Sequence, residues 1–238
     1  MRRFACLPLA LALAASPALA AVEASLALVS DYVYRGWSQT QGRPVLQGGL
    51  GWSLPRGLHL DAWGSGVDFG EDGPHPARWE ADLGAGLAGG DEERLAWDLS
   101  FFSYRYPGSS SGYDYAEAVL ALSRGGLGLE LAWSPDEYAA GAEGGRLGLA
   151  AERELGADWG LRAGAGCSLW SRPASAALFA EDGRAWALDG ELALGRALWN
   201  LDAELCLHAT DGRGRRLAAG QGGTRLVLQV GRSFSRGE

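Results

Sequence analysis

Apolar and polar residues alternate with a period of two along most of this chain. Between Trp79 and Leu87, for example, alternate residues are apolar, and Glu80 and Asp82 stand among the residues between them. Successive side chains of a β-strand point to opposite faces, so this pattern predicts strands with one apolar and one polar face. Twelve such segments are predicted, at residues 23–35, 43–54, 58–67, 78–87, 95–101, 113–122, 127–134, 146–152, 159–169, 186–194, 199–208 and 225–234.

The connections between these segments alternate in length. Short turns are predicted at 54–57, 123–126, 155–158 and 195–196, and longer polar loops at 36–42, 70–76, 106–112, 135–145, 171–183 and 211–222. An even number of strands, joined by short periplasmic turns and longer extracellular loops, is typical of bacterial outer-membrane barrels. No composition break or long linker divides the chain, so one domain is expected.

A soluble β-sandwich or a lipocalin-like barrel would show the same alternation. The polar faces, however, carry repeated pairs of carboxylates, which suit the polar interior of a membrane barrel. Trp and Tyr also recur near the ends of the apolar faces, at the depth of the two membrane interfaces. These aromatic residues are Tyr32, Trp52, Trp79, Trp97, Trp133, Trp159, Trp186 and Trp199. We therefore expect an all-β fold, a single transmembrane antiparallel up-and-down β-barrel of about 12 strands.

The first twenty residues have the features of an export signal. Two arginines follow Met1, an apolar run covers residues 5–15, and the segment ends in small residues at Ala18 and Ala20. Such a segment is typical of a cleaved signal peptide, and it is too short for a membrane-spanning helix of roughly 20 apolar residues. We predict a signal peptide at residues 1–20 and an outer-membrane β-barrel at residues 21–238 in a Gram-negative bacterium.

The charge of the chain excludes one class of partner. The formal net charge is −8, which becomes −10 once Arg2 and Arg3 are removed, and the chain contains no lysine. Nucleic-acid binding needs clustered Lys and Arg residues, so no nucleic-acid partner is expected. The expected partners are the lipid bilayer and lipopolysaccharide of the outer membrane, together with small-molecule solutes.

Two cysteines, Cys167 and Cys206, remain after the predicted signal peptide. Neither lies in a CxxC or Cys/His spacing that suggests a metal site, so we predict no metal, no cofactor and no catalytic residue. Cys167 falls on an apolar face and Cys206 on the polar face of another strand. Because cysteines on opposite faces cannot meet disulfide geometry, two free thiols are expected.

The polar faces would line the lumen, which about twelve strands should leave narrow and partly occluded. Acids and arginines that share this space can form a structural salt-bridge network. They can also line a pore that admits small polar or cationic solutes and repels anions. The residues predicted to line or constrict the pore are Asp31, Arg35, Arg43, Gln47, Asp61, Arg78, Glu80, Asp82, Asp98, Glu117, Glu130, Arg162, Asp202, Glu204 and His208.

Two other functions fit a barrel of this size. A lipid hydrolase would need a Ser-His-Asp site at the lipid-facing rim. The chain has three histidines, His59, His75 and His208, but no Gly-x-Ser-x-Gly elbow, and His208 by parity faces the interior. A structural or adhesive barrel could act through its loops, of which residues 171–183 form the longest candidate. The rows of lumen charge favour transport, and we do not expect an enzyme.

The segment at residues 30–44, SDYVYRGWSQTQGRP, is predicted to form the outer end of the first strand and its turn. By parity, Tyr32 and Tyr34 would point to the lipid interface, and Asp31 and Arg35 would point inward. Arg35 would stand near Arg43, so it needs an acid from another strand or from a loop. This arrangement suggests an element of the rim and constriction.

The same segment carries a family resemblance. It resembles the TorF-like porin family of proteobacterial outer-membrane proteins. Weaker matches follow at Trp63-Gly64-Ser65 and Tyr106-Pro107-Gly108, so the resemblance covers about the first half of the mature chain. The resemblance implies an outer-membrane barrel with a proposed pore function, and residues 226–234 resemble an assembly signal. The motif residues are Ser30, Asp31, Tyr32, Arg35, Gly36, Ser38, Gln39, Pro44, Gln47, Gly48 and Gly49.

Overall fold

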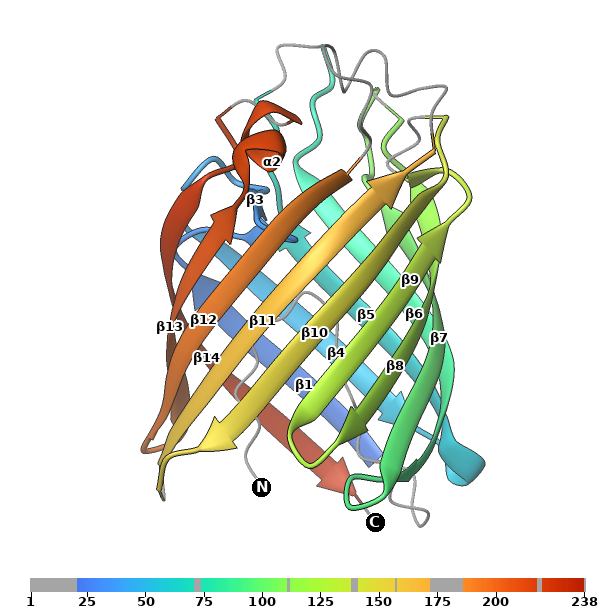
Figure 1. Ribbon diagram of the computed structural model, residues 1–238, viewed down its shortest axis with the longest axis vertical. Helices are drawn as coiled ribbons and strands as arrows, with labels where there is room; N and C mark the ends of the chain where they lie inside the picture. Colours follow the sequence, from blue (N-terminus) through green and yellow to red (C-terminus); the bar gives the residue numbers. More distant parts are fainter. Residues whose placement is uncertain are drawn as a thin grey trace.

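Twelve antiparallel strands close into a single barrel (Figure 1). The computed structural model describes residues 21–70, 74–110, 112–137, 141–156, 158–171, 186–217 and 220–237. The predicted signal peptide and most of the 171–183 loop lie outside these residues. The barrel strands are β1 (Ala21–Val29), β4 (Val45–Ser53), β5 (Leu58–Gly66), β6 (Trp79–Asp91), β7 (Leu95–Arg105), β8 (Tyr115–Arg124), β9 (Leu127–Ser134), β10 (Gly144–Glu154), β11 (Trp159–Trp170), β12 (Trp186–Leu198), β13 (Leu201–Thr210) and β14 (Thr224–Gly237).

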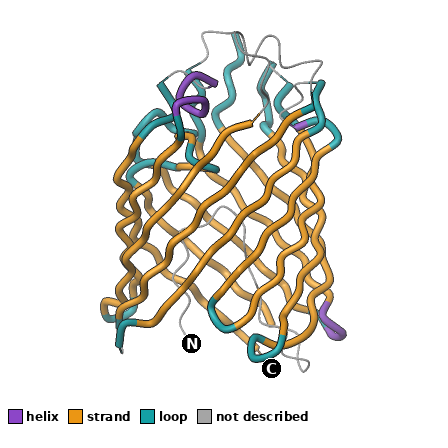
Figure 2. Tube along the Cα trace, in the orientation of Figure 1, coloured by secondary structure: helices purple, strands orange, loops and turns teal. Residues whose placement is uncertain are grey.

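Each barrel strand pairs with the strands that precede and follow it in sequence (Figure 2). The exception is the closing seam, where β1 pairs with β14 from Ala21↔Gly237 to Val29↔Gln229. Closure leaves no unpaired strand edge, as a sheet in a bilayer requires. The predicted fold class is therefore confirmed, and each predicted segment corresponds to one strand.

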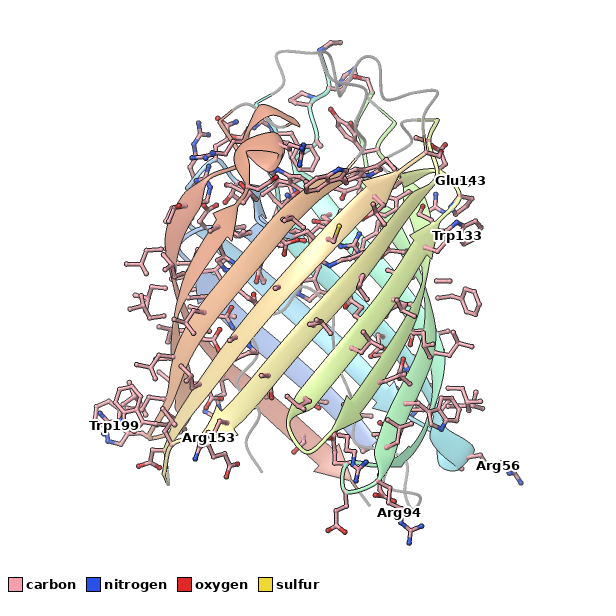
Figure 3. The ribbon with its side chains drawn as sticks, in the orientation of Figure 1. Arg56, Arg94, Trp133, Glu143, Arg153 and Trp199 are labelled. Atoms are coloured by element: carbon pink, nitrogen blue, oxygen red, sulfur yellow. The ribbon has the colours of Figure 1, made fainter. Side chains whose placement is uncertain are left out.

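The apolar faces of the strands point outward. Leu26, Leu50 and Phe101 are 50%, 59% and 63% exposed, which is expected of a surface that contacts lipid rather than water. Tryptophans mark both ends of this surface: Trp133 lies toward one end of the barrel and Trp199 at the other (Figure 3). Such positions match the aromatic belts of membrane proteins.

The short turns lie at the end of the barrel where β1 begins and β14 ends (Figure 1). One turn prediction was wrong: the chain does not reverse at residues 195–196. Gly195 and Arg196 stay within β12 and pair with Glu204 and Ala203 of β13. The chain reverses at Trp199, which has a positive φ of 56°. Glycine at position 195 is an inward strand residue rather than a turn residue, so the turn signal was misleading.

In the described part of the chain, four further elements accompany the barrel strands: the short strands β2 (Val33–Tyr34) and β3 (Trp37–Ser38), the 3-10 turn η1 (Pro55–Gly57) and the helix α2 (Gly212–Leu217). Among the described residues, no helix is long and apolar enough to cross a membrane. Cys167 and Cys206 make no disulfide, as the parity argument predicted.

Candidate functional site

The segment at residues 30–44, called the lumen segment below, folds into the barrel instead of extending the first strand. Its residues contact strands around the whole ring. Tyr32 packs edge-on against Trp63 of β5 with ring centroids 5.3 Å apart, and Trp37 packs against Trp170 of β11 at 5.9 Å. A segment that touches these separated walls must cross the lumen.

The predicted lipid-facing position of Tyr32 and Tyr34 was therefore wrong. Both side chains are buried, at 3% and 7% exposure, and Tyr34 lies near Tyr104 of β7. The first strand ends at Val29, six residues earlier than the alternation suggested. Beyond Val29 the period of two continues by coincidence, since the chain there pairs with itself in a separate sheet formed by β2 and β3.

A tight two-residue turn joins β2 and β3 inside the lumen. Arg35 and Gly36 both have positive φ, 48° and 83°, as the type I′ turn of a β-hairpin requires. At Gly36 a Cβ would collide with the methyl group of Thr210 and with Cβ of Asp189. The glycine of the motif thus permits both the turn and its close approach to the wall formed by β12 and β13.

Gly36→Ala should be more destabilising than Gly108→Ala. Both glycines have φ near +80°, but no atom lies within 4 Å of a Cβ at Gly108. Both variants therefore carry the same backbone strain, and only the first adds a collision, which costs about 1–3 kcal/mol more. Thermal unfolding of the purified barrels in detergent measures the difference. Equal melting temperatures would contradict the contact between the turn and the wall.

Asp31 organises the lumen segment from its base. Its Oδ1 accepts hydrogen bonds from the hydroxyls of Ser38 and Thr40, at 2.5 and 2.9 Å, and from the Gly42 amide at 3.2 Å. Its Oδ2 accepts one from Arg225 of β14 at 3.1 Å. One carboxylate thus holds the two arms of the hairpin together and attaches them to the barrel, which explains the Asp, Ser and Thr positions in the sequence.

Arg35, at the tip of the hairpin, forms ion pairs on the far side of the lumen. Its guanidinium donates to Glu117 of β8 at 2.9 Å and to Glu137, in the connection between β9 and β10, at 3.0 Å. All three side chains are at least 94% buried, with exposures of 6%, 1% and 2%. Burial lowers the pKa of Arg35, but the two carboxylates outweigh this effect and raise the pKa above its ordinary value. The acid expected from another strand or loop is therefore a pair of acids.

Glu137 was not a predicted site residue, because it lies in a loop, where a period of two assigns no face. Burial is the main cause that raises the pKa of this carboxyl to about 6, against an ordinary value of 4.5, and Glu117 raises it further while Arg35 lowers it. The folded protein therefore binds this proton more tightly than the unfolded chain does. The contribution of Glu137 to stability is greatest below pH 4.5 and declines as the pH rises through about 6.

Glu137→Gln should remove this pH dependence. Between pH 4.5 and 7, the wild-type protein should lose about 2 kcal/mol of stability relative to the variant, since one pKa unit corresponds to about 1.4 kcal/mol. Urea unfolding at several pH values measures the difference. Glu143→Gln is the control, because Glu143 is an exposed acid at the same end of the barrel (Figure 3). Parallel stability curves for wild type and Glu137→Gln would exclude the effect.

One wall of the lumen, from β9 to β13, carries two arginines that each bridge two carboxylates. Arg146 binds Asp189 through two hydrogen bonds, of 2.6 and 2.8 Å, and approaches Glu130 at 3.4 Å. Arg162 pairs with Glu191 and with Glu204. The guanidinium of Arg146 lies over the backbone of Gly166, where a Cβ would collide with it. The glycines of the polar face thus let charged side chains lie flat against the wall.

The opposite wall carries acids without arginines. Glu80 and Asp82 are neighbours on the inner face of β6, and each is 4% exposed. Glu80 accepts a 2.8 Å hydrogen bond from the Tyr106 hydroxyl, but its Oε2 and the Oδ1 of Asp82 are buried without a hydrogen-bond partner among the described residues. No described arginine or histidine forms an ion pair with either carboxylate. Both acids therefore lack a compensating cation among the described residues.

A second cluster on that wall surrounds His59 of β5. Its Nδ1 lies 2.6 Å from Asp61 and its Nε2 lies 2.8 Å from Asp98. Two carboxylates so close to one ring stabilise its protonated form, so the imidazole is a cation. Ser100 donates its hydroxyl to Asp98 and lies 3.4 Å from the same Nε2. An imidazolium cannot take the proton of a serine, so this Ser-His-Asp set is arranged as an ion cluster rather than as a nucleophilic site.

Two predicted lining residues lie at the exposed rim. The side chains of Arg43 and Arg78 are 67% and 59% exposed and approach Asp68 at 2.6 and 3.8 Å. Both residues precede their strands, which begin at Val45 and Trp79, so the alternation did not define their direction. The inner face does hold Gln47, which reaches Ser65 at 3.5 Å, and Asp202, which has a buried oxygen without a hydrogen-bond partner among the described residues.

Porins are among the solved structures that resemble this barrel. The KdgM porin aligns with a TM-score of 0.52 at 9% identity, over 90% of this chain and 99% of that one. The NanC porin aligns with a TM-score of 0.52 at 10% identity, over 91% and 99%. A second KdgM structure, in complex with disordered oligogalacturonate, aligns with a TM-score of 0.50 at 10% identity, over 90% and 99%. At these identities the likeness establishes a shared fold.

No curated protein matches the sequence. The sequence model of one family does, over residues 12–234, and that family is described as a bacterial protein of unknown function (Gcw_chp). Among the described residues, the match leaves out only the end of β14, so it includes both walls of the lumen. The chain therefore belongs to the Gcw_chp family, and its barrel has the fold of the porins.

Proposed function

We propose that this protein is an outer-membrane channel for small polar solutes, cationic or neutral. The observation that carries the proposal is the pair Glu80 and Asp82, two buried carboxylates on the inner face of β6 without a cationic partner among the described residues. Two neighbouring buried carboxyls without a cation carry about one negative charge between them. An uncompensated negative charge in a narrow passage attracts cations and repels anions. This is the chemistry expected of a cation-preferring pore.

The ion pairs of the lumen also favour cations over anions. On the β9–β13 wall, Arg146 and Arg162 each bridge two carboxylates, so acids outnumber arginines even where ion pairs form. The His59 cluster likewise places one cation between Asp61 and Asp98. An excess of carboxylate disfavours an anionic solute, including one like the oligogalacturonate of the KdgM complex.

The lumen segment supplies the constriction in this proposal. It crosses the barrel near the end with the long loops, and Arg35 ties its tip to the far wall. A channel restricted in this way should conduct in small steps. The predicted lining residues, the TorF-like assignment, the cleaved signal peptide and the contact with lipopolysaccharide belong to the same proposal.

Single-channel recording in planar bilayers tests the function. Purified refolded protein should give small conductance steps, and a salt gradient should give a reversal potential of the sign set by cation flow. Heat-modifiable migration on SDS gels establishes that the inserted protein is a folded barrel. Complete electrical silence from protein that passes this gel assay would exclude a channel and would favour a structural barrel.

A further inference from the structure

One cluster of potential metal ligands lies on the inner face of β12 and β13. Cys206 and His208 are alternate residues of β13, so both point inward, and Glu191 of β12 stands directly across from His208 in the ladder. One ligand atom of each residue, the thiol sulfur, an imidazole nitrogen and a carboxylate oxygen, lies within 4.8 Å of the other two. The Cys-x-His spacing alone does not identify a metal site in the sequence, because the third ligand comes from the neighbouring strand.

We propose that Glu191, Cys206 and His208 bind a transition-metal ion of the Zn²⁺ class. A thiolate, an imidazole and a single carboxylate are the mixed ligands that Zn²⁺ takes in tetrahedral sites with one open position. The soft thiolate selects against Mg²⁺ and Ca²⁺, which require oxygen ligands. The site is independent of the proposed channel, since it needs only the folded barrel.

The surroundings of the cluster prepare it for this ion. Glu191 gives one oxygen to Arg162, while its other oxygen lies 3.7 Å from Nδ1 of His208. Because Arg162 also pairs with Glu204 at 3.1 Å, its charge is already balanced. With Zn²⁺ bound to a thiolate, the charges of the ion, the thiolate, the two carboxylates and the guanidinium cancel. A bound divalent ion therefore leaves no net charge on these five groups.

The backbone leaves room for the ligands and keeps the thiol apart from solvent. Cys206 is fully buried and stands in the ladder between Ala193 and Val227, which are 1% and 2% exposed. At Gly164, a Cβ would lie 2.9 Å from Cγ of Glu191, so the glycine lets that side chain lie against the wall. Apolar neighbours strengthen the bond between a metal and its charged ligand.

Titration with Co²⁺ tests the site without any measurement of ion flow. The full chain, folded in detergent and kept reduced with a phosphine, should develop a thiolate-to-cobalt charge-transfer band that saturates at one equivalent. Addition of Zn²⁺ should abolish the band. Cys206→Ser should remove the band, and His208→Ala should weaken Co²⁺ binding about 100-fold, because loss of a direct ligand costs at least as much as loss of a supporting group.

Cys167→Ser is the matched control, since Cys167 is the other thiol and lies on β11 outside the cluster. That variant should keep the full band, and heat-modifiable migration should show that each variant is folded. Absence of the band in the wild-type protein would overturn the proposal, as would a band that depends on Cys167. If the protein conducts no current but binds Co²⁺ through Cys206, only the proposed channel function is overturned.

Discussion

Replacement of Arg35 by alanine should destabilise the protein by about 3–5 kcal/mol and increase its single-channel conductance. The guanidinium is buried between Glu117 and Glu137, so its removal leaves two carboxylates close together without a cation. Breaking a buried ion pair from one side costs this much because the remaining charge stays desolvated. The hairpin also loses its attachment to the far wall, and the passage beside it should widen.

Thermal unfolding in detergent and planar-bilayer recording measure the two effects on the same preparation. Arg43→Ala is the matched control, because it removes an arginine of the lumen segment whose side chain is 67% exposed. An exposed ion pair contributes about 0–1 kcal/mol, so that variant should melt and conduct like the wild type. If Arg35→Ala behaved in the same way as Arg43→Ala, the hairpin could not be the constriction.

Neutralisation of the acid pair, Glu80→Gln with Asp82→Asn, should lower the cation-to-anion permeability ratio about tenfold. The two buried carboxyls do not both ionise, so they carry about one negative charge between them. At about 6 Å in water, that charge lowers the energy of a passing cation and raises the energy of an anion by about 0.7 kcal/mol each, which is about threefold for each ion and about tenfold in the ratio. The folded barrel should tolerate the change or become more stable, since the amides carry no charge that burial penalises.

Reversal potentials in a salt gradient give the ratio before and after substitution. The control variant, Asp114→Asn with Glu143→Gln, removes the same formal charge from exposed acids outside the barrel strands. Its ratio should stay near that of the wild type, because solvent screens charges at the exposed rim. An unchanged ratio in the Glu80 and Asp82 variant would show that other residues of the lumen set the selectivity.

The two sets of variants examine connected parts of one site. The aromatic ring of Tyr32, in the lumen segment, belongs to the same buried cluster as Tyr106, whose hydroxyl binds Glu80. Displacement of the hairpin in Arg35→Ala therefore exposes the wall that carries the acid pair. A variant that combines Arg35→Ala with Glu80→Gln and Asp82→Asn should show whether the selectivity from the acid pair depends on the position of the hairpin.

The alternation of side chains was sufficient to establish the barrel, because a two-sided strand between lipid and a polar lumen has one arrangement of faces. It assigned Glu80 and Asp82 inward, separated Cys167 from Cys206, and located twelve strands. It misplaced Tyr32 and Tyr34, because parity has meaning only while a residue belongs to the barrel ladder, and the ladder of β1 stops at Val29.

The sequence by itself determined which residues of the barrel strands face the lumen, and the tertiary structure decided which of them meet. Parity places Glu117 and Cys206 inside but says nothing of position around the ring or of a segment that crosses it. The contact between Arg35 and Glu137, 102 residues apart, depends on the inward fold of the lumen segment and on a loop without periodicity. The approach of Glu191 to His208 depends on the register of two strands, which hydrogen bonding between them sets.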